Sequence, residues 1–521
     1  MTDHEYVYLG QPVRQIKDWE KTPDESDVFN FYGGDLQGVI NRLDYLSALG
    51  INMIYLNPIF VSPSNHKYDI QDYEHIDPHI GKIVKDSDTD RYAVRTLSDE
   101  NLNASDALFA LLVKAAHEHG IRVIIDGVFN HCGSFHQWMD REMIYEKAGK
   151  NEKGAFLHRD SRYRNYFMWD EDGQYDSWWG HFNHPKLYYE NSPELFDYMM
   201  NIAQKWLKPP YNADGWRIDV AADLGYSEEF NHQFWKEFRK KVKEVSKDAV
   251  IIAEHYGDAS HWLEGDEWDT VMNYDAFMEP VSWFFTGMEK HSDSYRGDLI
   301  ANGKAFEDAM TYNSAKLNSH AVRISMNQLS NHDHSRFLTR TNKRVGRLAS
   351  AGADAAEEGI NLAVLREAVL FQFLWTGIPT IYYGDEAGVT GWTDPDNRRT
   401  YPWGHENHEL LEFHRIMIHI RKSYRVLSEG SCRFIYSDYG AAAVARFDDD
   451  HCMIAVFNNT SEQRTIILPV WKVCAHTEGI LEYMLTSDAD GYSLTPSEHK
   501  IEHGLINIEI NGYGAVLLKN K

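Results

Sequence analysis

Three carboxylates in this chain stand where acid and base chemistry could be done. Asp219, Glu254 and Asp333 each lie at or just past the end of a short apolar run. Cleavage of a glycosidic bond needs two carboxyl groups, one to protonate the leaving oxygen and one to attack or stabilise the sugar cation. A third carboxylate can raise the pKa of the acid or hold sugar hydroxyls. These residues fit a sugar hydrolase, although metal hydrolases also place Asp and His at strand ends.

Basic side chains near the three carboxylates fit the same chemistry. Arg217 comes two residues before Asp219, so in a strand both side chains lie on the same face. A guanidinium there would keep Asp219 ionised and ready for nucleophilic attack. His131 and His332 could donate hydrogen bonds to the hydroxyls of a sugar ring.

Short apolar runs that alternate with helical patterns must position these residues. The runs show almost no polar alternation, which is typical of strands covered on both faces. They are residues 53–57, 122–128, 215–220, 250–255, 270–274, 324–330 and 380–386, with helices at 36–49 and 234–245 among the connections. This alternation predicts a parallel α/β fold, and the number of repeats predicts a (β/α)8 TIM barrel with its active site at the carboxyl ends of the strands.

The first strand of the predicted barrel is not clearly present. The runs leave one of eight positions open, and residues 6–10 (YVYLG) are the only strand-like run ahead of the first helix. Either this short run fills the position, or the chain begins downstream of a longer natural start.

Two further segments depart from the barrel pattern. The stretch between His131 and Glu194 is rich in Trp, Tyr, His and Asp and is too long for an ordinary loop. Near the C-terminus the pattern changes to short alternating strands, as at 442–447, 453–458 and 515–518. We therefore expect a catalytic barrel at 1–130 and 195–425, a small inserted domain at 131–194, and a C-terminal antiparallel β-sandwich at 426–521.

Composition excludes several classes of function. The chain has 52 Lys and Arg against 79 Asp and Glu, a net charge of −27. Such a chain lacks the basic surface that nucleic acids and anionic membranes require. The N-terminus does not read as a signal peptide, and the longest apolar stretch, 368–383, is too short and broken to span a bilayer. The four cysteines do not make a disulfide framework, so we expect a soluble, cytoplasmic protein.

Several blocks of sequence resemble the conserved blocks of the α-amylase family of glycoside hydrolases. They are DGVFNH (126–131), GWRIDVAAD (215–223), AEHYGDA (253–259) and SNHDHSRF (330–337), with further matches in GINMIYLNP (50–58) and YYGDEAG (382–388). The resemblance implies a retaining mechanism with Asp219 as nucleophile, Glu254 as general acid and base, and Asp333 as the third carboxylate. It also implies that the subsite of the attacked sugar is lined by Tyr68 of HKYD, His131, Arg217 and His332.

Finer motifs resemble one branch of this family. HPKL (184–187) is similar to a block of the neopullulanase, cyclomaltodextrinase and maltogenic amylase group, and the stretch after Glu254 looks like bacterial maltodextrin glucosidases. In DPDNRRTYPW (394–403), Asp394 and Arg398 match the residues that hold the sugar at the non-reducing side. The implied substrate is a maltodextrin or cyclodextrin with α-1,4 or α-1,6 bonds.

Several alternatives stay open at this level. The same residues could serve an α-glucan transglycosylase, and a non-catalytic sugar-binding member of the family is a third reading. No cofactor is expected. Calcium near Asn130 or Asp35 is conceivable, but Asp35 is better explained as the cap of the helix that starts at Leu36. The expected partner is an oligosaccharide, and the sequence does not determine the oligomeric state.

Overall fold

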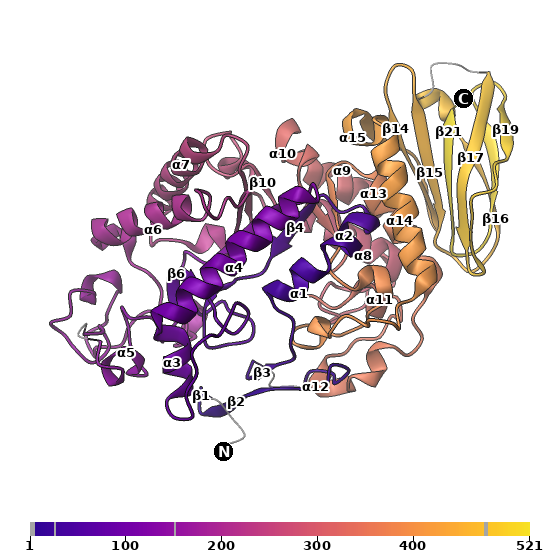
Figure 1. The fold of residues 1–521 in the computed structure, drawn as a ribbon. Helices are drawn as coiled ribbons and strands as arrows, with labels where there is room; N and C mark the ends of the chain where they lie inside the picture. The colour runs from indigo at the N-terminus through magenta and orange to yellow at the C-terminus, as the bar shows by residue number, and fades with distance from the viewer. Residues whose placement is uncertain (1–5, 25–27, 151–152, 474–477, 521) are drawn as a thin grey trace. The chain divides into compact units, whose positions relative to one another are not determined.

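The computed structural model describes residues 6–24, 28–150, 153–473 and 478–520 (Figure 1). The chain divides into two compact units. Unit 1 contains Met1–Trp19, Ser26–His255 and Ala259–Val271, and unit 2 contains Glu20–Glu25, Tyr256–Asp258 and Met272–Lys521. Cys132, Cys432 and Cys452 form no disulfide bond within the described part of the chain, and Cys474 lies outside it. Among the described residues, no helix is both long and apolar enough to cross a membrane.

Unit 1 is built on a five-stranded parallel sheet with the strand order β10-β9-β8-β7-β4. The strands are β4 (Met53–Leu56), β7 (Arg122–Gly127), β8 (Gly215–Ile218), β9 (Val250–Ala253) and β10 (Thr270–Val271). In register, Asp126 of β7 lies opposite Arg217 of β8, which lies opposite Ile252 of β9. The predicted strands from 53 to 274 are therefore confirmed in position and direction, although each ends earlier than the apolar run.

Helices between these strands begin at side-chain caps. Ser98 caps α4 (Asp99–Glu118), Ser192 caps α6 (Pro193–Lys205), and Ser227 caps α7 (Glu228–Val245). Each serine accepts a hydrogen bond from a backbone N–H of the first turn, which would otherwise have no partner. The first predicted helix, 36–49, is two helices, α1 (Leu36–Asn41) and α2 (Leu43–Leu49), because the backbone leaves the helical region at Arg42.

The N-terminal residues do not supply a barrel strand, so that prediction for residues 6–10 is wrong. β1 (Tyr6–Tyr8) pairs antiparallel with β2 (Gln11–Gln15), and β2 pairs with β3 (Asn30–Phe31) in a separate sheet. Leu9 and Gly10 have positive φ angles of 49° and 81°, the conformation of a tight hairpin turn. The hairpin buries Tyr8 and Val13 against Tyr92 and Phe135 in a small aromatic core of its own.

Residues between β7 and α6 hold little regular structure. They include α5 (Ile144–Lys147), short 3-10 turns at Arg164–Tyr166, Trp178–Gly180 and Tyr189–Asn191, and isolated bridges that pair His131 with Lys186 and Ser177 with Pro185. Ahead of them, β5 (Phe60–Val61) pairs with β6 (Asp72–Ile76), and α3 (Arg91–Leu97) precedes α4. These loops carry Tyr68 and His131.

Unit 2 contains a two-stranded parallel sheet of β11 (Met326–Gln328) and β12 (Ile378–Thr380). The strand predicted at 380–386 is thus misplaced. The chain leaves the extended conformation after Thr380, and a short 3-10 helix follows at Asp385–Ala387 after Gly384, whose φ is 88°. The helices ahead of the C-terminal strands are α8 (Glu279–Thr286), α9 (Gly303–Ser314), α10 (Ser319–Arg323), α11 (Phe337–Arg340), α12 (Leu348–Ala351), α13 (Leu362–Leu374), α14 (His408–Ser423) and α15 (Val426–Glu429).

The C-terminal part of unit 2 forms two antiparallel sheets with a shared apolar core. The larger sheet has the order β13-β14-β15-β21-β17-β18, with β19 beside β17, and β16 pairs with β20 in the smaller one (Figure 1). Buried aliphatic residues of both sheets, such as Ile454 and Ile508, belong to one cluster. The strands are β13 (Ser431–Asp438), β14 (Ala441–Phe447), β15 (Cys452–Asn458), β16 (Arg464–Leu468), β17 (Gly479–Asp488), β18 (Gly491–Ser493), β19 (Glu498–Ile501), β20 (Ile506–Ile510) and β21 (Gly514–Asn520).

Candidate active site

A single guanidinium links three carboxylates in unit 1. Arg217 is fully buried in β8, and its Nη1 donates to Asp126 at 3.1 Å and to Asp219 Oδ1 at 3.0 Å. Its Nη2 lies 2.8 Å from Glu254 Oε2. Asp219 directly follows β8 and Glu254 directly follows β9, so parallel pairing brings both carboxylates to the same end of the sheet. Two of the three predicted catalytic carboxylates are therefore close together, as expected.

The charges of this cluster do not balance. Burial and the Glu254 carboxylate raise the pKa of Asp219 well above its ordinary value, while Arg217 opposes the rise. Burial also raises the pKa of Asp126, against the pull of Arg217. One guanidinium cannot neutralise three carboxylates at once, so the cluster tends to retain a proton. The sequence predicted that Arg217 would keep Asp219 ionised; the contact exists, but the same charge also serves Asp126 and Glu254.

Two tyrosines hold Asp126 in place beside the guanidinium. Tyr55 Oη donates to Asp126 Oδ2 at 2.6 Å, and Tyr68 Oη donates to the same oxygen at 3.0 Å. The Arg217 guanidinium lies 5.9 Å from the centre of the Tyr68 ring. Tyr68 was predicted from its motif, whereas the sequence reasoning missed Tyr55. Tyr55 lies inside β4, which pairs with β7, and this position in a predicted strand could have indicated that Tyr55 lies near Asp126.

His131 lies in the same neighbourhood but is engaged by the backbone. Its Nε2 lies 3.2 Å from the carbonyl oxygen of Tyr68, and its Nδ1 lies 3.3 Å from Asn130 Nδ2. Burial lowers the pKa of His131 well below its ordinary value, so the ring is neutral near pH 7. The Trp178 ring stacks on it with centres 5.5 Å apart and an interplanar angle of 20°. The contact of His131 with a sugar hydroxyl stays a prediction.

The third carboxylate, Asp333, belongs to unit 2. It follows β11 by five residues and is partly exposed, and its Oδ2 lies 3.4 Å from Nε2 of the buried His332. The side chain of Asn331 shapes this turn, since its Oδ1 accepts hydrogen bonds from the backbone N–H groups of Asp333 and His334, both at 3.0 Å. His332 and Asp333 thus contact each other in this turn, and their roles at the sugar stay predictions.

Asp394 and Arg398 of unit 2 form an ion pair. The Arg398 Nε lies 2.5 Å from Asp394 Oδ1, one turn apart around the 3-10 helix Asp396–Arg398. Asn397 in the same turn donates to the carbonyl oxygens of Asn331 at 3.1 Å and His334 at 2.8 Å. This segment is therefore anchored to the loop that carries Asp333.

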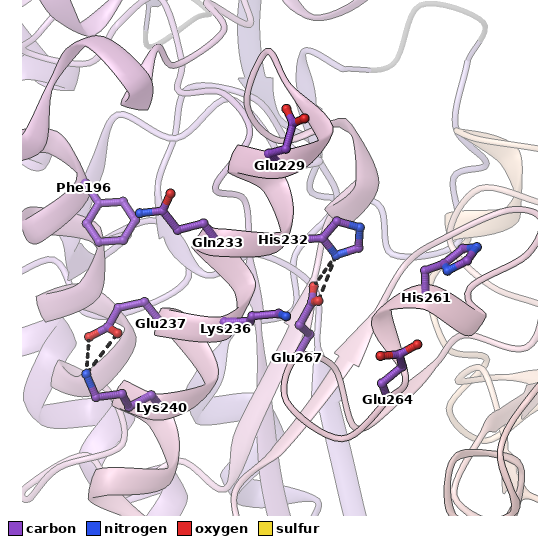
Figure 2. Close-up of a pocket in the computed structure, with 10 residues that line it drawn as sticks. All are labelled: Phe196, Glu229, His232, Gln233, Lys236, Glu237, Lys240, His261, Glu264 and Glu267. Atoms are coloured by element: carbon purple, nitrogen blue, oxygen red, sulfur yellow. Dashed lines mark hydrogen bonds and ion pairs between the residues drawn. The ribbon is translucent and has the colours of Figure 1, made fainter.

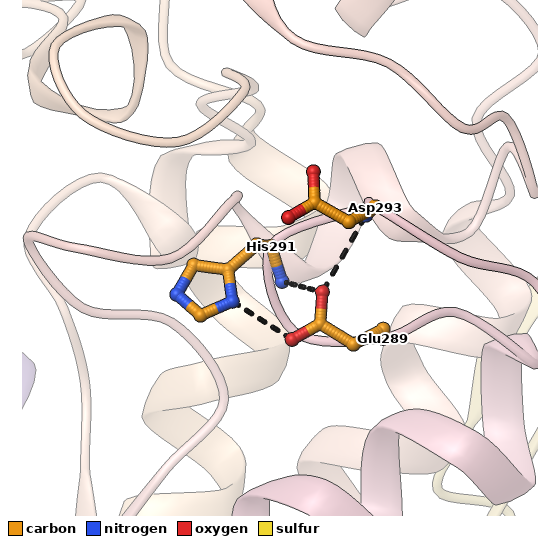
Figure 3. A group of neighbouring side chains, drawn as sticks. All are labelled: Glu289, His291 and Asp293. Atoms are coloured by element: carbon orange, nitrogen blue, oxygen red, sulfur yellow. Dashed lines mark hydrogen bonds and ion pairs between the residues drawn. The ribbon is translucent and has the colours of Figure 1, made fainter.

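Asn130, one of the two positions considered for calcium, has its Oδ1 buried without a hydrogen-bond partner, whereas Asp35 and a further carboxylate cluster are engaged by other groups. Asp35 caps α1, accepting from the Gly38 N–H at 2.7 Å, as the sequence predicted. Figure 3 shows Glu289, His291 and Asp293, whose ligand atoms lie within 4.8 Å of one another. His291 Nδ1 lies 2.8 Å from Glu289 Oε1, and Arg347 donates to Asp293 at 2.6 Å. These pairings account for the cluster as an ion-pair network.

One large cavity holds none of the predicted site residues. Figure 2 shows this cavity of about 940 Å³ between α7 and the loop from His261 to Glu267. Two pairs of its charged side chains contact each other, His232 with Glu267 at 2.8 Å and Lys240 with Glu237 at 3.0 Å. We therefore assign the chemistry to the Arg217 cluster and not to this cavity.

Comparison with known proteins identifies the family of the chain. The family model of the alpha-amylase catalytic domain matches residues 12–92 and 100–412. Neopullulanase 2 of Thermoactinomyces vulgaris is 35% identical over 454 residues, covering 85% of this chain and 65% of that protein. A cyclomaltodextrinase of Thermoanaerobacter pseudethanolicus is 34% identical over 469 residues, covering 87% of this chain and 68% of that protein. The chain thus spans about two thirds of the length of these relatives.

Solved structures give the same picture of the fold. A cyclic α-maltosyl-(1→6)-maltose hydrolase from Arthrobacter globiformis is 26% identical with a TM-score of 0.70, covering 97% of this chain and 93% of that chain. A cyclomaltodextrinase structure is 28% identical with a TM-score of 0.73, covering 99% and 75%. The predicted architecture of a TIM barrel with a C-terminal β-sheet domain is therefore confirmed.

Proposed function

Because the chain belongs to the alpha-amylase family of glycoside hydrolases, we propose that it cleaves α-1,4 or α-1,6 glucosidic bonds of maltodextrins or cyclodextrins with retention of configuration. The observation that carries this proposal is the pair of carboxylates bound to the two terminal nitrogens of Arg217. Retaining glycosidases need two carboxyl groups only about 5 Å apart, and two carboxylates on one guanidinium fit that requirement.

In this mechanism Asp219 attacks the anomeric carbon and Glu254 protonates the departing oxygen. Glu254 then takes a proton from the water that cleaves the glycosyl–enzyme bond. Arg217 supports the role of Asp219, because its charge and its hydrogen bond to Asp219 favour the ionised nucleophile, against burial and the neighbouring Glu254, which raise the pKa of Asp219. Asp333 would act as the third carboxylate, stabilising the distorted sugar.

The remaining predicted residues would hold the substrate. Tyr68, His131, Arg217 and His332 would surround the attacked sugar, and Asp394 with Arg398 would bind the non-reducing end. Residues 1–130 and 195–425 would form the barrel, 131–194 an inserted domain, and 426–521 the C-terminal domain.

The test is the product pattern from maltotetraose and a cyclodextrin. We expect maltose and glucose from both, with the α-anomer appearing first in the proton NMR spectrum. First appearance of the β-anomer would exclude the retaining mechanism. Products longer than the substrate would indicate a transglycosylase, and Asp219→Asn protein serves as the control for contaminating activity.

A further inference from the structure

One tryptophan of unit 1 is both exposed and held in an unfavourable backbone conformation. Trp179 is 81% exposed, and its φ and ψ angles are 50° and 28°. A residue with a side chain pays about 1 kcal/mol or more for the left-handed conformation, which glycine adopts freely. A large exposed aromatic ring also loses contact with the core. Both costs are explained if the ring serves a ligand.

The surrounding backbone fixes this conformation. On one side Trp178 N donates to His184 O at 3.0 Å, and on the other Lys186 N donates to Asp176 O at 3.0 Å. Ser177 bridges to Pro185 in the same ladder. Trp179 therefore projects from a turn that is anchored on both sides, which suits a preformed binding surface.

A small cavity opens beside this ring. Its volume is about 210 Å³, and it is lined by Asp176, Ser177, Trp178, Trp179, Lys186 and Asp223. The volume equals that of about seven liquid waters at ~30 Å³ each, a space that one sugar ring can fill. The lining combines two aromatic rings with two carboxylates and an ammonium, so it offers apolar faces to C–H groups and polar partners to hydroxyls.

The cavity is connected to the reacting carboxylates through short contacts within unit 1. Trp178 stacks on His131, and its Nε1 donates to Asp223 Oδ2 at 3.0 Å. Asp223 lies four residues after Asp219 in the turn that follows β8. The cavity thus lies next to the site of the attacked sugar.

We propose that this cavity binds a further glucosyl unit of the α-glucan, with the Trp179 ring stacked on the sugar. This inference rests on the proposed function. Because Trp178 contacts both His131 and Asp223, we place this unit beside the attacked sugar.

Binding is measured by calorimetric titration of Asp219→Asn protein, which cannot turn the ligand over, with maltotetraose. Adding Trp179→Gly should weaken binding about tenfold while leaving the melting temperature equal or higher, because glycine relieves the backbone cost. Adding Trp179→Phe instead should restore most of the affinity. Trp471→Ala is the matched control, since Trp471 is 58% exposed in the C-terminal domain and should leave the affinity unchanged.

The outcomes distinguish failure of the cavity proposal from failure of the proposed function. Unchanged affinity in Trp179→Gly, with maltotetraose still bound by Asp219→Asn protein, would overturn the cavity proposal and leave the proposed function standing. A lowered melting temperature with unchanged affinity would assign Trp179 a structural role and also overturn it. Failure of Asp219→Asn protein to bind maltotetraose, maltose or a cyclodextrin would contradict the proposed function and the cavity proposal together.

Discussion

The hydroxyl of Tyr8 connects three segments that are far apart in the sequence. It donates a short hydrogen bond to Asp69 and accepts one from Asn183 Nδ2 at 2.8 Å. Burial and the Asp69 carboxylate raise the pKa of Tyr8, so the hydroxyl stays protonated and remains a donor. Asp69 follows Tyr68, and Asn183 precedes the HPKL block, so the hairpin supports two loops of the proposed site.

Two substitutions at this position should have different costs. Tyr8 is 1% exposed, and replacement of such an aromatic residue by alanine costs about 3–5 kcal/mol of unfolding free energy. Tyr8→Phe keeps the packing and removes the hydrogen bonds to Asp69 and from Asn183, of which the bond to the charged group costs about 1.5–3 kcal/mol. Asp69 Oδ1 still accepts from Ser62 Oγ at 2.6 Å, so we expect the lower end of that range.

Urea unfolding and steady-state kinetics measure the two effects. We expect Tyr8→Ala to lose about 3 kcal/mol, and Tyr8→Phe to raise the KM for maltotetraose severalfold with a smaller change in kcat. Val7→Ala is the matched control, because Val7 is the neighbouring residue of the same strand and is 54% exposed. It should change stability by less than about 0.5 kcal/mol. If Tyr8→Ala were no more destabilising than Val7→Ala, the hairpin would not be anchored as described.

Three further predictions address the chemistry and the substrate. Asp219→Asn should lower the hydrolysis rate on maltotetraose by about 10³-fold or more with an unchanged circular dichroism spectrum, and a variant that keeps a tenth of the rate would remove Asp219 from its role. Burial raises the pKa of Glu142 to about 7, although a hydrogen bond from Ser134 opposes the rise. The protonated form of Glu142 therefore contributes its full stabilisation below pH ~4.3, and this stabilisation is lost as the pH rises to about 7. Glu142→Gln should therefore stabilise the protein by about 1–3 kcal/mol at pH 8 and by little at pH 4, as urea unfolding at the two pH values would show; equal effects at both would contradict the assignment. Soluble maltotetraose should be hydrolysed much faster than granular starch, and comparable initial rates of reducing-sugar release would refute this substrate preference.

Residues whose position follows from a local pattern were the ones that the sequence could predict. Asp219 and Glu254 directly follow buried strands, and parallel pairing alone brings them together. The 3-10 turn at Asp385–Ala387 was misread as part of a strand, because a short run rich in Tyr and Ile looks the same whether or not it continues in a sheet.

Contacts between distant segments left no such pattern. The Tyr8 hydroxyl forms hydrogen bonds with Asp69 and Asn183, which are 61 and 175 residues away. The sequence next to Asp69 and Asn183 does not indicate these bonds. The sequence also predicted only part of the sharing of Arg217 by three carboxylates. Its spacing to Asp219 was read correctly, but the links to Asp126 and Glu254 depend on the register of neighbouring strands.

The contact between Tyr8 and Asn183 has a consequence for the order of events during synthesis. The hairpin is synthesised before its partner, which is 175 residues further along the chain. At about 5–20 residues per second, the hairpin waits roughly 10–35 s for Asn183. During that interval the Tyr8 side chain lacks Asn183 and the loop around it. The nascent chain is therefore most exposed to misassociation before residue 183 emerges, and chaperone binding to stalled chains should fall once that residue has been made.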